Sequence, residues 1–316
     1  MMRFMAEYNV RSDPDAGWLD PDNVATFART LEEVGFGALA FTDHPAPSAK
    51  WLAAGGHETF DPFAALTYCA AVTRRIRLMT HLAVVPYRNP LLQARSMTTV
   101  DVLSGGRAIF ALGTGYLRSE FAALGVDAHE RNELFDEAVE VIRKAWTQDV
   151  VEHTGRHFHA TGQAMLPRPV QRPHPPLWLG GNSGLALDRV ARFGQGWAAL
   201  VGSPQLARSA RTTSITSTAQ LADRIRELER RLHARGRTLA EIDVLAPTPA
   251  GVLANGWSPA QRLDELARLR EAGVTWAGVV LPGGGFAAAM DSVRRFGAEV
   301  VPALTPSDDH RRTTCC

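Results

Sequence analysis

Residues 36–45 read FGALAFTDHP, and this stretch decides the fold. A small apolar run at 38–41 stops at Thr42, Asp43 and His44, and Pro45 blocks further strand. The pattern predicts a buried strand that ends in an ionisable pair. Barrel enzymes and other parallel α/β folds place their chemistry at this end of a strand. An isolated Asp-His dipeptide usually only forms part of a turn. Whether this pair is functional therefore has to be inferred from the rest of the chain.

Short apolar strands alternate with amphipathic stretches along the whole chain, which indicates a parallel sheet. Eight such units favour a closed (β/α)8 barrel, the TIM barrel, over an open doubly wound sheet. Strands are expected at residues 3–8, 38–41, 76–85, 108–112, 177–179, 196–200, 243–247 and 276–281.

No fixed-spacing repeat or linker divides the chain, so one barrel domain with insertions is expected over residues 1–305. Residues 203–218 are rich in Ser, Thr and Ala, and we expect a mobile insertion there. A hairpin is expected around residues 154–156, and the polar tail at 306–316 is expected to be disordered.

Composition excludes several functional classes. The chain has 316 residues, 45% of them hydrophobic and 21% charged, with a net charge of +1, so no basic surface for nucleic acid or anionic membrane is expected. No apolar run approaches the roughly 18 residues of a membrane span, and the N-terminus lacks the apolar core of a signal peptide. A cytoplasmic protein is therefore expected. From the three cysteines, no disulfide framework or thiolate metal site is expected.

Four polar or glycine-rich clusters lie within predicted strands or directly after them. In a barrel they would meet at the carboxyl ends of the strands, where Gly113 and Gly115 would let a flat ligand pass closely. The clusters are Asp43 with His44, Thr80 with His81, Gly113 with Thr114, Gly115 and Tyr116, and Gly180 with Gly181, Asn182 and Ser183.

The cluster at residues 180–183 has the clearest chemistry. Two glycines let the backbone approach a ligand, and the start of the following helix suits a phosphate group. Asn182 or Ser183 could instead only cap that helix, and the two roles can coexist.

Other motifs are incomplete. GTGYLR at residues 113–118 lacks the third glycine of a dinucleotide-binding turn. His153, His157 and His159 have no nearby carboxylate or cysteine that completes a zinc pattern, and histidines in a hairpin are usually solvated, so no metal site is expected. Ser183 lacks the glycines of a nucleophile elbow, which leaves acyl transfer unsupported.

Taken in order, the stretches GFGALAFTDH, RIRLMTHLAVVPYRNPLLQARSMTTVDVLSGGRAIFALGTGY and RPVQRPHPPLWLGGNS with ARFGQGW resemble the bacterial luciferase-like superfamily. The resemblance is strongest to its branch of probable oxidoreductases that use the deazaflavin coenzyme F420. It runs from about residue 3 to residue 200, weakens over 203–218 and resumes over the last two strands.

The resemblance implies a barrel with a flavin or deazaflavin ring at its carboxyl end. His44 matches the histidine that faces the reacting carbon, and Asp43 matches a ring contact. A bulge in the third strand, often with a non-proline cis peptide, backs the ring in this family, and the corresponding bond here is His81-Leu82. The phosphate position of the family falls on Gly180 and Gly181.

Two positions depart from the family. Its sugar-phosphate dehydrogenases carry a tryptophan and a glutamate where this chain has Ser48 and Tyr116, which puts sugar-phosphate oxidation in doubt. Trp51 could partly replace the tryptophan.

The expected activity is hydride transfer between F420 and a small organic substrate. His44 would act as acid/base, because imidazole exchanges protons near neutral pH, and Asp43 would support it if it lies within hydrogen-bond reach. Tyr116 is a weaker candidate to orient the substrate.

One alternative is an FMN-dependent monooxygenase supplied by a flavin or deazaflavin reductase, and a second is a flavin-binding barrel without catalysis. The resemblance also implies a homodimer.

Overall fold

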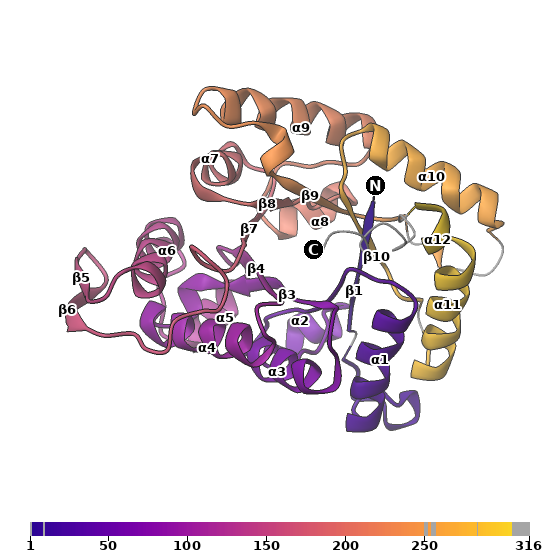
Figure 1. Ribbon diagram of the computed structural model, residues 1–316, viewed down its shortest axis with the longest axis horizontal. Helices are drawn as coiled ribbons and strands as arrows, with labels where there is room; N and C mark the ends of the chain where they lie inside the picture. The colour runs from indigo at the N-terminus through magenta and orange to yellow at the C-terminus, as the bar shows by residue number, and fades with distance from the viewer. Residues whose placement is uncertain (1, 9, 250–251, 254–256, 283, 305–316) are drawn as a thin grey trace, which may run out of the picture.

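The computed structural model describes residues 2–8, 10–249, 252–253, 257–282 and 284–304. The predicted tail at 306–316 lies outside the described residues. Within them, eight parallel strands close into a barrel in the order β1-β10-β9-β8-β7-β4-β3-β2, and helices surround it (Figure 1). The predicted (β/α)8 barrel is therefore confirmed. Its strands are β1 (Arg3–Glu7), β2 (Ala38–Phe41), β3 (Arg77–Val84), β4 (Ala108–Gly113), β7 (Leu177–Gly180), β8 (Gly196–Ala198), β9 (Asp243–Pro247) and β10 (Trp276–Val279).

The long helices begin where the sequence places capping residues. Asp20 and Asp61 accept hydrogen bonds from the first turns of α1 and α3, and a proline follows each as the first helical residue. The long helices are α1 (Pro21–Glu33), α3 (Pro62–Val72), α4 (Pro90–Leu103), α6 (Arg131–Thr147), α7 (Gly184–Phe193), α9 (Thr218–His233), α10 (Pro259–Glu271) and α11 (Phe286–Glu299).

The predicted hairpin is confirmed as an antiparallel pair outside the barrel, formed by β5 (Val151–Thr154) and β6 (His159–Gln163). Shorter elements complete the connections. They are α2 (Ala49–Ala53), α5 (Arg118–Ala123), α8 (Pro204–Ser209), α12 (Val301–Leu304), and the 3-10 turns η1 (Pro14–Ala16), η2 (Val85–Tyr87) and η3 (Leu239–Glu241).

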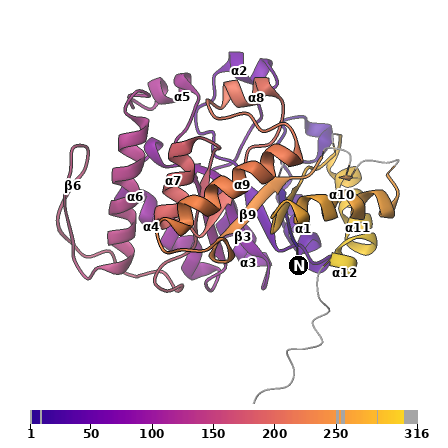
Figure 2. The same cartoon turned by 90° about the horizontal axis from the view of Figure 1, so that it is seen from above.

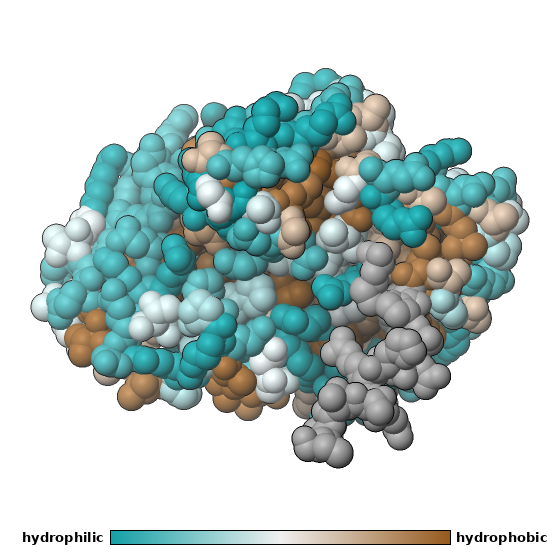
Figure 3. Space-filling model, turned by 45° about the horizontal axis from the view of Figure 1, so that its top comes forward, coloured by the Kyte–Doolittle hydropathy of each residue, from teal (hydrophilic) through white to brown (hydrophobic). Residues whose placement is uncertain are grey.

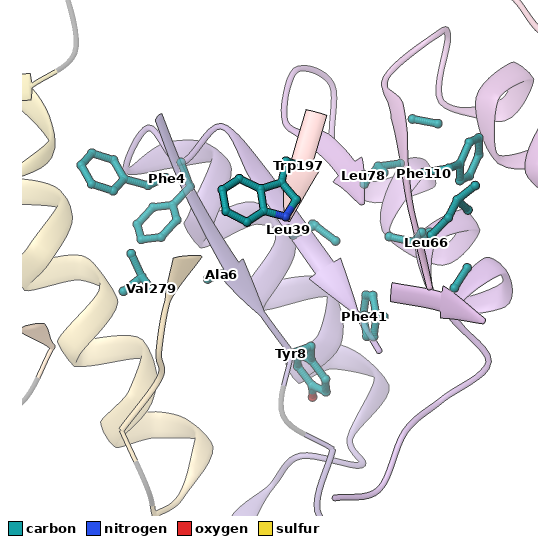
Figure 4. Close-up of a cluster of buried hydrophobic side chains, with 14 of the residues drawn as sticks. Phe4, Ala6, Tyr8, Leu39, Phe41, Leu66, Leu78, Phe110, Trp197 and Val279 are labelled. Carbon is teal, nitrogen blue, oxygen red and sulfur yellow. The ribbon is translucent and has the colours of Figure 1, made fainter. Parts of the chain in front are cut away.

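Side chains alternate between two hydrophobic layers. Residues on the outer face of the strands, such as Phe4 and Leu39, pack beneath the helices (Figure 4). The inner face fills the barrel, where Trp178 and Trp276 meet edge to face with ring centroids 5.4 Å apart. The barrel interior is therefore a packed core, and ligands have access only at its ends.

Three short helices stand at one end of the barrel. Figure 2 shows α2, α5 and α8 on the same side of the molecule, each in a connection that leaves the carboxyl end of a strand. The sequence pattern did not predict them, because helices this short carry little hydrophobic periodicity. Residues 203–218 are thus more structured than composition predicts: they include α8, and Ile215 is buried. The mobility of this segment stays a prediction.

The outer surface is ordinary for a globular domain. On the face shown in Figure 3, hydrophilic side chains cover most of the area and apolar ones form separate patches. Among the described residues, no helix has both the length and the apolar character needed to cross a membrane.

Candidate active site

The barrel brings the four predicted clusters together. They lie after β2, within β3 and at the ends of β4 and β7, which are consecutive neighbours in the sheet, so the clusters share one arc of the barrel. A direct link joins the first cluster to β3, since the backbone N–H of Val84 donates to the Asp43 carboxylate over 2.9 Å. The convergence that the strand pattern implied is therefore real in the fold.

His44 follows β2, the strand at one end of this arc. Its Nδ1 lies 3.0 Å from Oε2 of Glu120, a residue of α5 whose side chain is fully buried. Because a carboxylate only accepts hydrogen bonds, this contact places the proton on Nδ1 and leaves Nε2 as the free nitrogen of the neutral ring. No hydrogen bond from the described part of the chain reaches Nε2. The pair thus offers one nitrogen for proton exchange with a ligand.

Glu120 is held by two further donors. The Tyr87 hydroxyl donates to Oε2 over 3.0 Å, and the backbone N–H of Ala46 donates to Oε1 over 3.3 Å. The three partners satisfy the carboxylate away from water. Burial and the Glu120 charge raise the pKa of Tyr87 far above its usual value, so its hydroxyl stays a donor at neutral pH.

Three aromatic rings lie close to the ring of His44. Trp51 lies 4.7 Å away between ring centroids, His57 5.0 Å and Tyr116 5.7 Å. Burial lowers the pKa of His57, and burial with the charge of Glu120 raises that of Tyr116 to about 12. Both rings therefore favour their neutral forms beside the histidine.

A second histidine-carboxylate pair stands on the neighbouring strands. Nδ1 of His81 lies 2.7 Å from Oε2 of Glu7, at the end of β1. The His81-Leu82 peptide is cis, as the resemblance implied, and the pairing of β3 with β4 shifts between His81 and Ala83. This bulge turns Leu82 toward the barrel interior, where it packs on the inner core.

Leu82 covers the two glycines that follow the adjacent strands. A Cβ added to Gly180 would lie 2.1 Å from Leu82 Cδ1, and one added to Gly113 would lie 3.3 Å away. Only glycine at position 180 lets Leu82 take this place. The Leu82 side chain over these glycines forms an apolar platform on the strand next to the one that His44 follows, and a platform of this kind fits the face of a flat ring system.

The residues of the cluster at 180–183, at the start of α7, have different roles. The Ser183 hydroxyl accepts from the backbone N–H of Ala186 and caps the helix, which was one of the two predicted roles. Gly181 has φ 99°, a backbone conformation that favours glycine. Binding of a phosphate by Gly180 and Gly181 stays a prediction.

Three predicted cofactor contacts have buried side chains that the protein itself engages in hydrogen bonds or ion pairs, and their role toward a cofactor stays a prediction. Asp43 forms an ion pair with Arg88, with oxygen to nitrogen distances of 2.6 and 2.8 Å. Its carboxylate therefore supports the rim, and the partner of His44 Nδ1 is Glu120. The Thr80 hydroxyl donates to the carbonyl of Ala111. The Asn182 amide bonds to the backbone of Leu200 and Thr213.

The expectation from the sequence that the protein holds no metal site stays a prediction. Among the residues that the structure describes, no group of three or more His, Cys, Asp or Glu side chains could hold a metal ion. His153 is buried against Glu137, at 3.2 Å, and not solvated as expected for a hairpin residue.

Glu120 is the functional residue that sequence reasoning missed. The family glutamate expected directly after Gly115 is replaced by Tyr116, and Glu120 follows four residues later, which is about one helical turn. That displaced acidic residue was the available signal. It was hidden because the short helix α5 was not predicted. His57, Tyr87 and Glu7 were also missed, since each reaches the rim from a different connection or strand end.

Fold and site together define an α/β barrel with a histidine-carboxylate pair at its carboxyl rim. The family model described as luciferase-like monooxygenase matches residues 2–270, so the chain belongs to the luciferase-like monooxygenase family. Its membership confirms the resemblance seen in the sequence and assigns the chain to a family of oxidoreductases.

The chain also resembles a curated protein at a lower level of sequence identity. The uncharacterized protein y4vJ of Sinorhizobium fredii (strain NBRC 101917 / NGR234) is 29% identical over 163 residues, which cover 52% of this chain and 44% of that protein. The chain thus matches less than half of the length of this curated relative.

Solved structures of similar fold cover nearly the whole chain. The monooxygenase RslO1 from Streptomyces bottropensis aligns with TM-score 0.78 and 22% identity over 96% of this chain and 100% of that one. The coenzyme F420 dependent tetrahydromethanopterin reductase from Methanopyrus kandleri aligns with TM-score 0.72 and 18% identity over 96% and 99%. At these identities the likeness concerns the fold alone.

Proposed function

We propose that the protein is an F420-dependent oxidoreductase that transfers a hydride between the deazaflavin and a small organic substrate. The observation that carries this proposal is the His44–Glu120 pair, which presents Nε2 of His44 at the rim beside the platform of Leu82. A bound deazaflavin would supply the hydride at a ring carbon, so the protein has to supply positioning and a proton.

The residues of the rim suit both tasks, the positioning of the ring and the transfer of the proton. Leu82, Gly113 and Gly180 would carry the ring, while His44 would take or return the proton of a carbonyl, alcohol or activated alkene. Glu120 stabilises the imidazolium that forms when Nε2 accepts a proton, because its buried charge stays 3.0 Å from Nδ1. The rings of Trp51, His57 and Tyr116 lie close to the His44 ring and would contact the substrate.

The second candidate is an FMN-dependent monooxygenase that receives reduced flavin from a partner reductase. The family description and the similarity to RslO1 favour this alternative. A barrel that binds flavin without catalysis is the third. All three would use the same rim, and they differ in the coenzyme and in the reaction that the bound coenzyme undergoes.

Competitive binding of F420 and FMN to the purified protein separates these candidates. We expect F420 to bind more tightly and its absorbance to change when a substrate is oxidised or reduced. Preferential binding of FMN would overturn the proposal in favour of the monooxygenase. Tight binding of F420 with no absorbance change across carbonyl, alcohol and alkene substrates would favour the non-catalytic barrel.

The role of His44 is tested by His44→Ala. We expect F420 binding to survive and turnover to fall on the order of 10²–10⁴-fold, because only the proton transfer is lost. His233→Ala is the matched control, since it removes an exposed imidazole from α9. Turnover by His44→Ala at the rate of the control would contradict the assignment.

A further inference from the structure

The pair of His81 and Glu7 closes the inner core of the barrel on its carboxyl side. Met5 of β1 and Met79 of β3 belong to the inner hydrophobic layer. Because side chains alternate along a strand, Glu7 and His81, each two residues further on, face the interior as well. β2 lies between these strands and turns the small side chain of Ala40 inward, so Nδ1 of His81 reaches Oε2 of Glu7 over 2.7 Å.

Two polar atoms of this pair are open to a ligand or to water. The carboxylate only accepts hydrogen bonds, so the proton of the neutral imidazole lies on Nδ1 and leaves Nε2 free. Within the residues that the structure describes, no hydrogen bond reaches Nε2 of His81 or Oε1 of Glu7. These side chains are 31% and 28% exposed, whereas those of His44 and Glu120 are 9% and 0% exposed. The His81–Glu7 pair can therefore exchange protons with water directly.

The pair also adjoins the platform for a flat ring. His81 directly precedes Leu82, whose side chain covers Gly113 and Gly180. A ring that accepts a hydride at a carbon gains two electrons and one proton, and therefore one negative charge. A neighbouring group that gains a proton in the same reaction keeps the local charge constant, which stabilises the reduced ring in a partly buried site.

The surroundings of His81 leave this task to its own imidazole. The strands next to β3 turn Ala40 and Ala111 inward at this level, and neither side chain carries a charge. Burial lowers the pKa of His57 although the charge of Glu7 opposes this shift, so His57 favours its neutral form. Burial and the Glu120 charge raise the pKa of Tyr116 to about 12, so its hydroxyl keeps its proton.

We propose that the His81–Glu7 pair takes up a proton when the ring at the platform accepts a hydride, and thereby favours the reduced coenzyme on the enzyme. This role rests on the proposed function and adds the direction of the reaction, the oxidation of the substrate. For an alcohol, the carbon loses a hydride to the ring carbon and the hydroxyl loses a proton to Nε2 of His44. Nε2 of His81 gains a proton from water, and His44 then releases its proton to water, so charges and protons balance.

The test compares the affinities of oxidised and reduced F420, measured by anaerobic calorimetric titration. The variants are His81→Gln, which keeps a hydrogen-bonding side chain that cannot take a proton, and Glu7→Gln, which keeps an acceptor without its charge. His233→Gln is the control, because His233 is an exposed residue of α9. We expect affinity for reduced F420 to fall about three- to thirtyfold in both variants, while affinity for oxidised F420 stays within about twofold of the wild type.

The number of protons taken up on binding is the second measurement. It is obtained by repeating the titrations in two buffers that differ in their enthalpy of ionisation. We expect the wild type and the control to take up more protons with reduced than with oxidised F420, and His81→Gln to lose this difference. Equal losses of affinity for both forms would indicate a structural role of His81. That result, or unchanged affinities and proton numbers, would overturn the inference.

FMN separates this failure from failure of the proposed function. If F420 binds but the variants leave the ratio of the two affinities unchanged, only the inference fails. If FMN binds and F420 does not, the proposed function fails, and the same titrations are made with oxidised and reduced FMN. A preference for reduced FMN that His81→Gln loses would then support the role of the pair, and an unchanged ratio would overturn it. If neither coenzyme binds the wild type, both proposals are overturned.

Discussion

His44 takes its orientation from Glu120, a carboxylate 76 residues further along the chain. The side chain of Glu120 is fully buried, and its contacts with Tyr87 and Ala46 fix where it points. A buried and fully bonded acceptor of this kind decides which nitrogen of the imidazole is free. The chemistry at residue scale therefore belongs to a pair of residues and not to the Asp43-His44 dipeptide.

We expect Glu120→Gln to lower turnover about 10- to 1,000-fold while F420 affinity and KM change less than about threefold. The variant removes the charge that stabilises the imidazolium, and its amide can donate to Nδ1, which would turn Nε2 into the protonated nitrogen. Steady-state kinetics and coenzyme titration measure the two effects separately.

Glu271→Gln is the control for this substitution, because Glu271 ends α10, outside the site. Parallel losses of coenzyme affinity and turnover in Glu120→Gln would indicate a structural role and contradict the positioning role.

At the scale of elements, the bulge of β3 and the glycines after β4 and β7 work as one unit. The register shift between His81 and Ala83 accompanies the inward position of Leu82, and Gly180 leaves the space that the Leu82 side chain occupies. None of these features is recognisable in one strand alone. Their combination forms the platform beside His44.

Gly180→Ala tests this platform, because the added Cβ would meet Leu82 Cδ1 at 2.1 Å and displace it. We expect F420 affinity to fall at least about tenfold, while the free energy of unfolding falls by only about 1–2 kcal/mol, since Leu82 is a flexible side chain at the rim. Coenzyme titration and urea unfolding measure these quantities.

Adding Leu82→Ala to Gly180→Ala supplies the internal control. The smaller side chain removes the clash, so part of the lost affinity should return in the double variant. Wild-type affinity in Gly180→Ala, or no recovery in the double variant, would show that Leu82 does not carry the ring.

At the scale of the whole molecule, the fold buries tyrosines both in the hydrophobic core and at the candidate active site. Burial raises the pKa values of Tyr8, Tyr87 and Tyr116, that of Tyr116 to about 12. In an unfolded chain each would ionise near pH 10.

The homodimer and the reductase partner stay predictions.

These shifts make stability depend on alkaline pH. Between about pH 10 and pH 12 the unfolded chain loses tyrosine protons that the folded chain keeps, so the free energy of unfolding should fall as pH rises through this range and be unaffected by these groups below it. Urea unfolding at a series of pH values measures the fall, and Tyr116→Phe should reduce it. Ionisation of all four tyrosines near pH 10 in the folded protein, seen by ultraviolet absorbance, would refute the expectation.

The sequence by itself determined the barrel, its strand order along the chain and the rim positions of His44, Gly113 and Gly180. These follow from local patterns: apolar runs that end in polar residues or glycines, and capping residues before helices. Parallel strands then necessarily bring such ends to one face.

Only the tertiary structure decided which side chains at the rim are free. Asp43, Thr80 and Asn182 look like His44 in the sequence, yet burial and hydrogen bonds to Arg88, Ala111 and Leu200 engage them. Glu120 joins the site because α5 folds back over the strand ends, and no local pattern records a contact between residues so far apart in the chain. Hydrogen bonding depends on distances that exist only once the barrel has closed.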